Sequence, residues 1–291
     1  MNISGNTKLI GLLGDPISHS LSPFMHNLSF NKVKKDYAYL CLPTGKKDLG
    51  KVLETLKIVG AKGANITYPN KIEIVKYLDE ASDEVQIIGS CNTILIDENK
   101  KIKGYNTDGR GFVKSLKNNS IDIKGKTFGI MGLGGAGSAI ATCLGLEGLK
   151  RLYVKEVDFD KAKNVKKRLE EKIKGLEIIL TKDQQHFAKN LDKMSLVINA
   201  TPIGMGRSKD DSPMDPEYLR GFPLIIYDII YSPLETTLLR KAKSYGLKVF
   251  NGIGMMINQG AISFNIWTGE EMDTKLVKER IVKLLKWQEI K

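Results

Sequence analysis

A glycine-rich segment in the middle of the chain has the residue types that hold a phosphate group. An apolar strand is expected before Gly132-Leu-Gly134-Gly135-Ala136-Gly137, and a helix after it. The first glycine of this pattern allows a tight turn, the second lets a pyrophosphate approach the backbone, and the third lets the helix pack on the strand. The helix N-terminus adds unpaired N–H groups and a positive dipole end. The segment therefore predicts dinucleotide binding, the alternative being a purely structural glycine turn.

Two carboxylates follow the next expected strand and indicate which dinucleotide binds. Glu156 and Asp158 lie about 20 residues beyond the glycine loop, where an acid that binds the adenosine ribose is expected. A carboxylate there accepts hydrogen bonds from ribose hydroxyls and repels a 2′-phosphate. No arginine follows this strand, although Lys155 and Lys161 are near. The pattern favours NAD over NADP, and the alternative is that Glu156 is only a solvated strand end.

Four polar clusters in the first part of the chain follow or lead out of expected strands. They are residues 18–23, 65–71, 92–93 and 106–109. In open α/β sheets a ligand lies beyond the carboxyl ends of the strands, so the clusters can converge on one cleft. Each also has a structural alternative. Ser22 before Pro23 suits a helix N-cap, and Asp108 could cap the helix that follows it.

Short apolar strands alternate with amphipathic helices and must position these residues. Such alternation indicates βαβ units and mainly parallel sheets. We expect an α/β protein of two domains, an open, mainly parallel substrate-binding domain over 1–110 and a Rossmann-type NAD(P)-binding domain over 111–252, with helices in 253–291 returning to the first. Expected strands lie near 8–13, 36–42, 61–66, 92–97, 126–131, 150–155, 176–180, 195–199, 224–229 and 247–250. Expected helices lie near 22–33, 46–59, 70–88, 107–118, 135–147, 159–174, 234–245, 253–268 and 274–288.

Composition narrows the class of protein. The 291 residues carry a formal net charge of +12, supplied mostly by lysines spread along the whole chain. This favours a solvated basic surface over a nucleic-acid-binding module, which is the alternative. The three cysteines match neither a zinc pattern nor a disulfide framework, so no metal is expected. With neither a signal peptide nor a membrane span expected, these residues predict a cytoplasmic protein.

Together, and in this order, the motifs resemble the shikimate dehydrogenase family over almost the whole chain. The resemblance implies reversible reduction of 3-dehydroshikimate to shikimate by a nicotinamide cofactor, in the biosynthesis of chorismate and the aromatic amino acids, by a homodimer. The segments that carry it are GDPISHSLSP, NITYPNK, GSCNTI, GYNTDG, the glycine loop, NATPIGM, DIIYSP and NGIGM followed by Gln259.

Two details look more like the quinate/shikimate branch of that family. Asn70 precedes the motif lysine where many strict shikimate dehydrogenases have an aromatic residue, and the Asn-Arg-Thr signature of NADP-selective members is missing. Other quinate-active members carry Thr at the position of Ser22, where this chain keeps Ser. A catabolic NAD-dependent quinate dehydrogenase and a cofactor-binding pseudoenzyme are the alternatives.

The resemblance also implies a role for individual residues. Lys71 and Asp108 would flank the reacting hydroxyl, where a cationic lysine stabilises developing alkoxide charge and donates a proton. His19 and His26 are alternative acid–base groups. The substrate carboxylate would be bound by Ser20, Ser22 and Tyr231, and the ring hydroxyls by Thr67, Asn92 and Gln259. The expected cofactor contacts are Gly132, Gly134, Gly135, Ala136, Gly137, Glu156, Asp158, Thr201, Met205, Gly252 and Met255.

Overall fold

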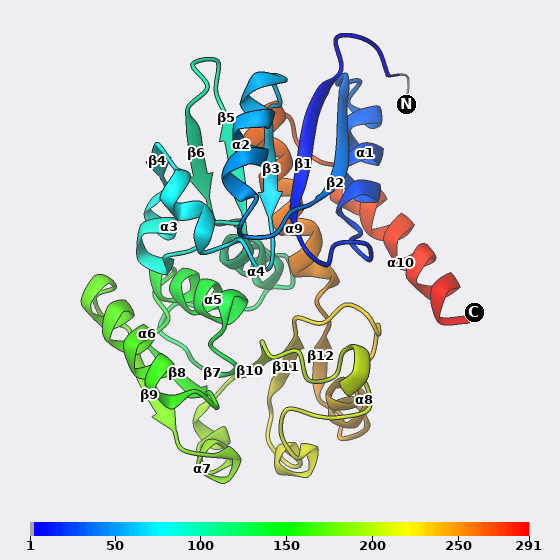
Figure 1. Cartoon of the computed structure of the whole chain (residues 1–291). Coiled ribbons are helices and arrows are strands. Elements are labelled where there is room, and N and C mark those ends of the chain that lie inside the picture. Colours follow the sequence, from blue (N-terminus) through cyan, green and yellow to red (C-terminus); the bar gives the residue numbers. More distant parts are fainter. Residues whose placement is uncertain (1–2, 291) are drawn as a thin grey trace. The chain divides into compact units, whose positions relative to one another are not determined.

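The computed structural model describes residues 3–290, which form two compact units. The first unit runs to Gly111 and resumes over Ile257–Leu284, and the second comprises Phe112–Met256 and the chain from Leu285 onward. Within the described residues each unit contains one six-stranded sheet (Figure 1). The unit boundaries fall inside three helices, α4 (Thr107–Asn118), α9 (Ile253–Thr268) and α10 (Thr274–Ile290). The predicted fold class, two α/β domains with C-terminal helices joining the first, is confirmed.

The sheet of the first unit is mixed, with strand order β2-β1-β3-β5-β6-β4. Strand β1 pairs in parallel with β2 and β3, whereas β5 is antiparallel to both of its neighbours. The strands are β1 (Lys8–Gly14), β2 (Tyr37–Pro43), β3 (Gly63–Ile66), β4 (Glu80–Ala81), β5 (Thr93–Ile96) and β6 (Ile102–Tyr105). The helices are α1 (Ser22–Lys32), α2 (Leu49–Ile58), α3 (Asp83–Ile88) and the 3-10 turn η1 (Glu73–Tyr77).

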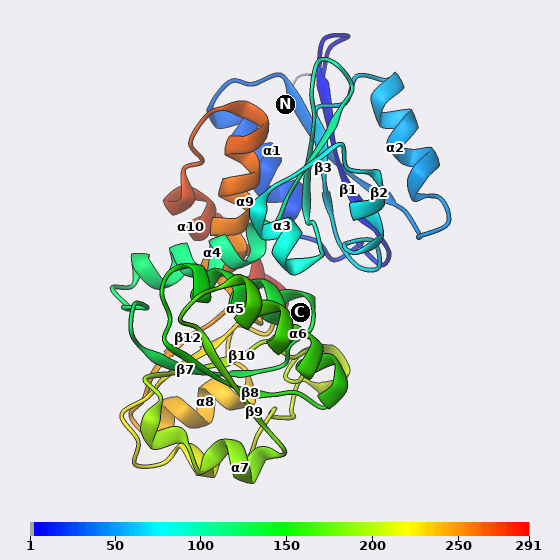
Figure 2. The ribbon, with the colours of Figure 1, turned by 90° about the vertical axis from the view of Figure 1, so that its left-hand side faces the viewer.

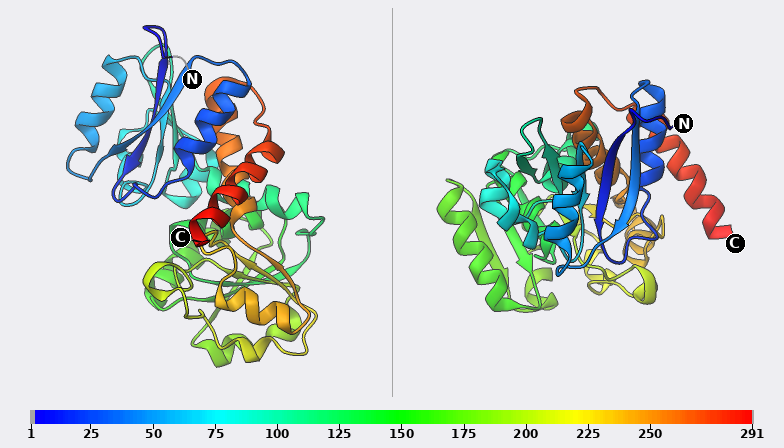
Figure 3. Two further views of the ribbon diagram at one scale, coloured as in Figure 1. Left: turned by 90° about the vertical axis from the view of Figure 1, so that its right-hand side faces the viewer. Right: turned by 45° about the horizontal axis from the view of Figure 1, so that its top comes forward.

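Helices cover both faces of this sheet. Leucines of α2, among them Leu53, pack on one face against buried residues of β1, β3 and β5 such as Leu13, Ile66 and Ile94. Helices α1 and α9 lie on the opposite face (Figure 2; blue and orange in the left view of Figure 3). The indole of Trp267 on α9 donates a hydrogen bond to Ile94 O at 2.9 Å, which anchors that helix to the sheet.

The prediction of one helix over 70–88 is wrong, and β6 was not predicted. The segment instead forms η1, β4 and α3, because strand pairing competes with the helix. Asp79 N donates to Ile102 O, and Ile102 N donates to the Asp79 carboxylate, so the chain at Asp79 is tied to β6. Strand β6 has the sequence IKGY, whose short alternation and glycine give a weak strand signal. A turn in which the Asp97 carboxylate accepts from Lys101 N leads into it.

The sheet of the second unit is wholly parallel, with strand order β12-β11-β10-β7-β8-β9. The chain starts at β7, builds to β9 on one side and then returns to β10 on the other. The order therefore reverses beside β7, where doubly wound sheets bind ligands. The strands are β7 (Thr127–Met131), β8 (Arg151–Lys155), β9 (Glu177–Thr181), β10 (Leu196–Asn199), β11 (Ile225–Asp228) and β12 (Lys248–Phe250). Helices are α5 (Gly135–Leu146), α6 (Phe159–Lys172), α7 (Gln184–Ala188) and α8 (Thr237–Ser244), with 3-10 turns η2 (Leu191–Lys193), η3 (Gly206–Ser208) and η4 (Pro216–Leu219).

Among the described residues, no helix is both long and apolar enough to cross a membrane.

The short helix α7 was not expected from the sequence.

An aromatic cluster between α1, β2 and α9 encloses His26. Its ring is 0% exposed and stacks on Tyr39 with centroids 4.6 Å apart, while Trp267 contacts it edge-on at 5.2 Å. Neither ring nitrogen has a hydrogen-bond partner within the described residues. Burial lowers the pKa of His26 to about 3. An imidazole in these surroundings is held neutral, and it is not accessible for acid–base chemistry.

We expect His26 to make the protein acid-sensitive. The unfolded chain binds a proton at His26 below its ordinary pKa of about 6.5, whereas the folded protein does not until about pH 3. Stability is therefore present above pH 6.5 and is lost as the pH falls, by about 2 kcal/mol between pH 7 and 5. Urea unfolding at pH 7, 6 and 5 should show this loss in wild type and in the control His186→Gln, and less of it in His26→Phe. Equal pH dependence in all three proteins would contradict the expectation.

Candidate functional site

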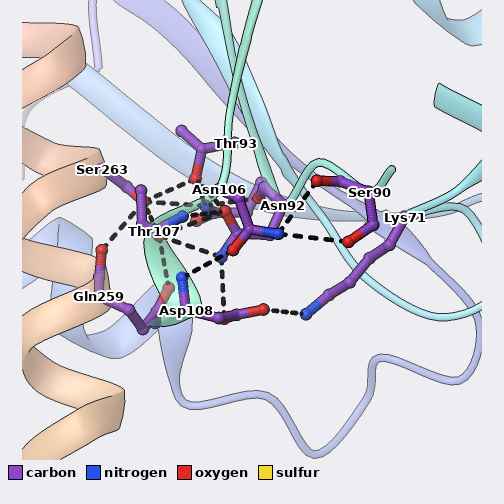
Figure 4. Close-up of polar contacts among 10 residues, drawn as sticks. Lys71, Ser90, Asn92, Thr93, Asn106, Thr107, Asp108, Gln259 and Ser263 are labelled. Atoms are coloured by element: carbon purple, nitrogen blue, oxygen red, sulfur yellow. Dashed lines mark hydrogen bonds and ion pairs between the residues drawn. The ribbon is translucent and has the colours of Figure 1, made fainter. Parts of the chain in front are cut away.

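Lys71 and Asp108 form an ion pair in the first unit. Lys71 Nζ lies 2.6 Å from Asp108 Oδ2, and the two side chains are 27% and 12% exposed (Figure 4). Lys71 comes from the turn that follows β3, in which Asn70 N donates to Thr67 O at 2.8 Å. Asp108 lies in the first turn of α4, where the helix dipole favours a negative charge. The fold thus brings together two residues that are 37 positions apart.

Asn92 supports the other oxygen of the Asp108 carboxylate. Thr107 N donates to Asn92 Oδ1 at 2.8 Å, and a backbone N–H can only donate, so this contact fixes which end of the amide is oxygen. Asn92 Nδ2 therefore faces Asp108 Oδ1, at 2.9 Å. Asn106 rather than Asp108 caps α4, since its side-chain oxygen accepts from Asp108 N at 3.2 Å. Both carboxylate oxygens thus have a donor, one charged and one neutral.

Sheet register explains why these residues meet. Asn65 at the end of β3 is paired with Thr93 at the start of β5, and Thr93 is paired with Tyr105 of β6. The polar residues that follow β3, precede β5 and follow β6 consequently lie beyond the same end of the strands. Helix α9 adds Gln259, whose Oε1 lies 3.4 Å from Thr107 Oγ1.

Four buried side chains contribute to this cluster without having been assigned a role from the sequence. Asn65, Thr93 and Thr107 belong to the predicted polar clusters, whereas Ser263 was not singled out at all. Ser263 lies four positions after Gln259 on α9, so the two share a helix face. That spacing is the one signal that could have found Ser263.

The other predicted substrate-binding residues are Ser20, Ser22, Thr67 and Tyr231. Ser20 and Ser22 are partly buried beside α1, and Ser22 N donates to Ser20 Oγ at 3.2 Å. Ser22 is the first residue of α1, with Leu21 at the N-cap position, so the capping alternative for Ser22 is wrong. Thr67 is half-buried after β3. Tyr231 belongs to the second unit, and its joint role with the two serines stays a prediction.

The glycine loop of the second unit has the conformation that a phosphate site needs. Gly132 has φ +89°, and α5 starts at Gly135 with Gly134 at its N-cap. A Cβ at Gly137 would lie 2.1 Å from Gly132 O, so only glycine permits this packing. A Cβ at Gly134 or Gly135 would meet no atom within 4 Å. The loop is closed on its inner side and open over the helix N-terminus, which fits a dinucleotide pyrophosphate.

Glu156 closes the glycine loop from the end of β8. Leu133 N donates to Glu156 Oε2 at 2.6 Å, and Asp158 N donates to Oε1 at 3.2 Å. The Asp158 carboxylate in turn caps α6 by accepting from Lys161 N at 3.0 Å. Glu156 lines a cavity of about 620 Å³ together with Lys155, Val157, Phe159, Lys182, Asp183 and Gln184.

The side chain of Lys155 has a hydrogen-bond partner other than Glu156. Its Nζ donates to Pro213 O at 2.7 Å, and burial lowers its pKa. Lys161 is exposed on α6.

A buried carboxylate organises the two loops that carry further predicted cofactor contacts. Asp228, at the end of β11, accepts from Asn199 Nδ2 at 3.1 Å and from Thr236 Oγ1 at 2.8 Å. Burial raises its pKa. Asn199 Oδ1 accepts from Thr201 N at 3.0 Å, which shapes the loop that leads to Met205.

The remaining predicted contacts belong to the same unit. A Cβ at Gly252 would lie 1.8 Å from Ile229 O, so a side chain would not fit there. Met255 is buried, whereas Met205 is 48% exposed. Gly252, Met205 and Met255 stay predicted cofactor contacts.

Comparison with known proteins gives consistent matches. A family model described as the shikimate dehydrogenase substrate binding domain matches residues 12–94, and one described as the shikimate 5′-dehydrogenase C-terminal domain matches residues 252–281. A protein of Alkaliphilus metalliredigens named shikimate dehydrogenase (NADP(+)) is 38% identical over 96% of this chain and 98% of its own length.

Solved structures agree with this match. Shikimate 5-dehydrogenase from Listeria monocytogenes, in complex with shikimate and NAD, superposes with a TM-score of 0.91 at 35% identity, covering 97% of this chain and 98% of that one. Quinate dehydrogenase from Corynebacterium glutamicum, in complex with NAD, has a TM-score of 0.87 at 27% identity, covering 96% and 100%.

Proposed function

Because this chain belongs to the shikimate dehydrogenase family, we propose that Lys71 and Asp108 perform its proton chemistry. The protein is a CH–OH oxidoreductase that interconverts shikimate and 3-dehydroshikimate in the shikimate pathway of aromatic amino-acid biosynthesis, with a nicotinamide dinucleotide. The 2.6 Å contact between Lys71 Nζ and Asp108 Oδ2, with Asn92 on the other carboxylate oxygen, is the observation that carries the proposal.

The pair handles the proton that accompanies hydride transfer. A bound nicotinamide supplies or accepts the hydride at the substrate carbon. In the reduction, the Lys71 ammonium donates a hydrogen bond to the substrate oxygen, stabilises its developing negative charge and gives it a proton. In the oxidation the same amine takes the proton back. Asp108 holds the ammonium in place and accepts a hydrogen bond from the reacting hydroxyl.

Neighbouring side chains orient the substrate. Asn92 and Gln259 belong to the same hydrogen-bonded network as the ion pair and bind ring hydroxyls, as does Thr67. The hydroxyls of Ser20 and Ser22, with Tyr231, bind the carboxylate through charge-assisted hydrogen bonds. In this proposal residues 1–110 with 253–291 form the substrate-binding domain, and residues 111–252 form the cofactor-binding domain.

Replacing Lys71 should remove most turnover without unfolding the protein. We expect Lys71→Ala to lower kcat for shikimate about 100-fold or more, as is typical when a positioned acid–base group is lost. Lys76→Ala is the matched control, because Lys76 is an exposed lysine with its own carboxylate partner, Glu73, at 2.9 Å. The measurement is the initial rate of NADH formation, with circular dichroism to check folding. A rate for Lys71→Ala within about threefold of wild type, under roughly 0.7 kcal/mol of barrier, would refute the assigned role.

The cofactor preference in this proposal is NAD over NADP. Both oxygens of Glu156 accept backbone N–H groups, so the carboxylate is fixed at the end of β8 beside the cavity that it lines. A carboxylate held there accepts hydrogen bonds from ribose hydroxyls and repels a 2′-phosphate. Lys155 offsets this charge only in part, because its ammonium donates to Pro213 O and forms no ion pair with Glu156 among the described residues. Adenosine is therefore bound beside Glu156, Val157 and Phe159.

Glu156→Gln tests the charge separately from the shape. Glutamine keeps an oxygen that can accept from Leu133 N but removes the negative charge. We expect wild type to bind NAD more tightly than NADP, and Glu156→Gln to narrow that ratio about tenfold, or about 1.4 kcal/mol. Asp160→Asn is the control, since it makes the same change in net charge at an exposed carboxylate of α6. Calorimetric titration without substrate gives the ratios, and an unchanged ratio in Glu156→Gln would contradict the charge argument.

Quinate is the second substrate in this proposal. The Asn70 form of the lysine motif favours the quinate/shikimate branch, and the fold matches that of a quinate dehydrogenase in complex with NAD. Asn70 is fully buried and donates to Thr44 O at 2.8 Å, so its effect on the substrate passes through the backbone of Lys71.

We expect quinate to be oxidised with a lower kcat/KM than shikimate, because Ser22 is retained. Ser22→Thr should raise the ratio of quinate to shikimate activity. Initial rates with both substrates give this ratio, and absence of quinate turnover in both proteins would restrict the enzyme to shikimate.

The homodimer and the cytoplasmic location stay predictions.

A further inference from the structure

We propose that Ser263 of α9 is a positioning residue, which fixes the hydroxyl of Thr107 and thereby holds Asn92 against Asp108. The inference rests on the proposed role of the Lys71–Asp108 pair. Ser263 is 0% exposed, so it acts on the reaction only through its neighbours.

The Ser263 hydroxyl is the point where four segments of the first unit meet. Its Oγ lies 2.8 Å from Thr93 Oγ1 on β5 and 3.2 Å from Thr107 Oγ1 on α4 (Figure 4). It accepts from Asn65 Nδ2 of β3 at 3.2 Å, and Gln259 O within its own helix lies 3.1 Å away as an acceptor. A serine used only to satisfy its own helix would make the last contact alone.

Counting donors and acceptors gives these contacts a direction. Asn92 Nδ2 donates to Thr107 Oγ1 at 3.0 Å as well as to Asp108 Oδ1. Since the Thr107 hydroxyl accepts there, its own proton goes to another oxygen. The candidates are Ser263 Oγ at 3.2 Å, Asn92 Oδ1 at 3.3 Å and Gln259 Oε1 at 3.4 Å. Asn92 Oδ1 already accepts from Thr107 N at 2.8 Å.

Asn92 Oδ1 also lies 3.1 Å from Thr93 Oγ1, which can donate to it, so Ser263 Oγ is the nearest oxygen left for the Thr107 proton. The Ser263 proton goes either to Gln259 O at 3.1 Å or to Thr93 Oγ1 at 2.8 Å. In both arrangements Asn92 donates to Thr107 and Thr107 donates to Ser263, so the amide that supports Asp108 is held in one orientation.

Removing the Ser263 hydroxyl would redirect that proton without leaving a buried donor unpaired. The Thr107 hydroxyl would turn to Asn92 Oδ1 or to Gln259 Oε1, and either contact disturbs a side chain that supports the reaction. Asn65 Nδ2 keeps two acceptors, Asn92 O at 3.1 Å and Thr93 Oγ1 at 2.9 Å. The change should therefore affect catalysis more than folding.

Ser263→Ala with Ser29→Ala as control tests the proposal. Ser29 is a buried helical serine that donates to the carbonyl four residues earlier, Met25 O, at 2.8 Å. Both variants lose this type of bond, and only Ser263→Ala also loses the bonds to other segments. We expect kcat/KM for shikimate to fall about tenfold in Ser263→Ala and less than twofold in Ser29→Ala. Both variants should remain folded by circular dichroism, and NAD affinity should not change.

A second route to the same hydroxyl keeps the test decisive if Ser263→Ala folds poorly. Thr93→Val removes a Ser263 partner from β5 together with a contact to Asn92 Oδ1 at 3.1 Å, and it leaves Asn65 Nδ2 with Asn92 O and Ser263 Oγ as acceptors. We expect a loss in the same direction, and a double variant whose loss is smaller than the product of the single losses.

Two results would overturn the proposal. One is a kcat/KM for Ser263→Ala equal to that of Ser29→Ala, and the other is fully multiplicative losses in the double variant. Failure of the underlying function is distinguishable, because it would show as retained activity in Lys71→Ala.

Discussion

The ion pair between Lys71 and Asp108 is the constraint around which the first unit is arranged. A carboxylate that is 12% exposed is costly to desolvate unless donors replace its water. The helix dipole of α4, the Lys71 ammonium and the Asn92 amide provide that replacement together. Each comes from a different segment, so the pair can exist only when the turn after β3, the start of β5 and the start of α4 are in place. Folding and assembly of the candidate site are therefore one process.

Antiparallel pairing in the first sheet makes this convergence possible. In a wholly parallel sheet, Asn92 precedes β5 and would lie beyond the opposite ends of the strands from Lys71, which follows β3. Because β5 runs against β3, Ile66 N donates to Asn92 O at 2.8 Å, and Asn92 N donates to Tyr105 O at 3.1 Å. The residues before β5 thus lie between those after β3 and those after β6.

The sequence predicted what depends on local pattern and missed what depends on tertiary pairing. Glycine spacing and apolar periodicity are local, so the glycine loop, most helices and the two-domain α/β fold could be predicted. The segment 70–88 failed because pairing with β6, which is distant in sequence, decides its structure. Lys71 and Asp108 were found through motif resemblance, since neither residue differs locally from other lysines and aspartates. Ser263 was missed for a related reason: a serine in a helix gains a role only from the segments packed against it.

In the glycine loop of the second unit, one carboxylate determines which backbone N–H groups are left for a phosphate. Leu133 N is used by Glu156, so this N–H is not available to a phosphate. The first intrahelical bond of α5 is Ser138 N to Gly134 O, at 2.8 Å. By helix geometry, the N–H groups of Gly135, Ala136 and Gly137 have no partner within α5. Under the proposed function, these three donors meet the pyrophosphate. In that proposal the same Glu156 that occupies the earlier donor also places its negative charge at the ribose, which would couple phosphate binding and cofactor preference through one side chain.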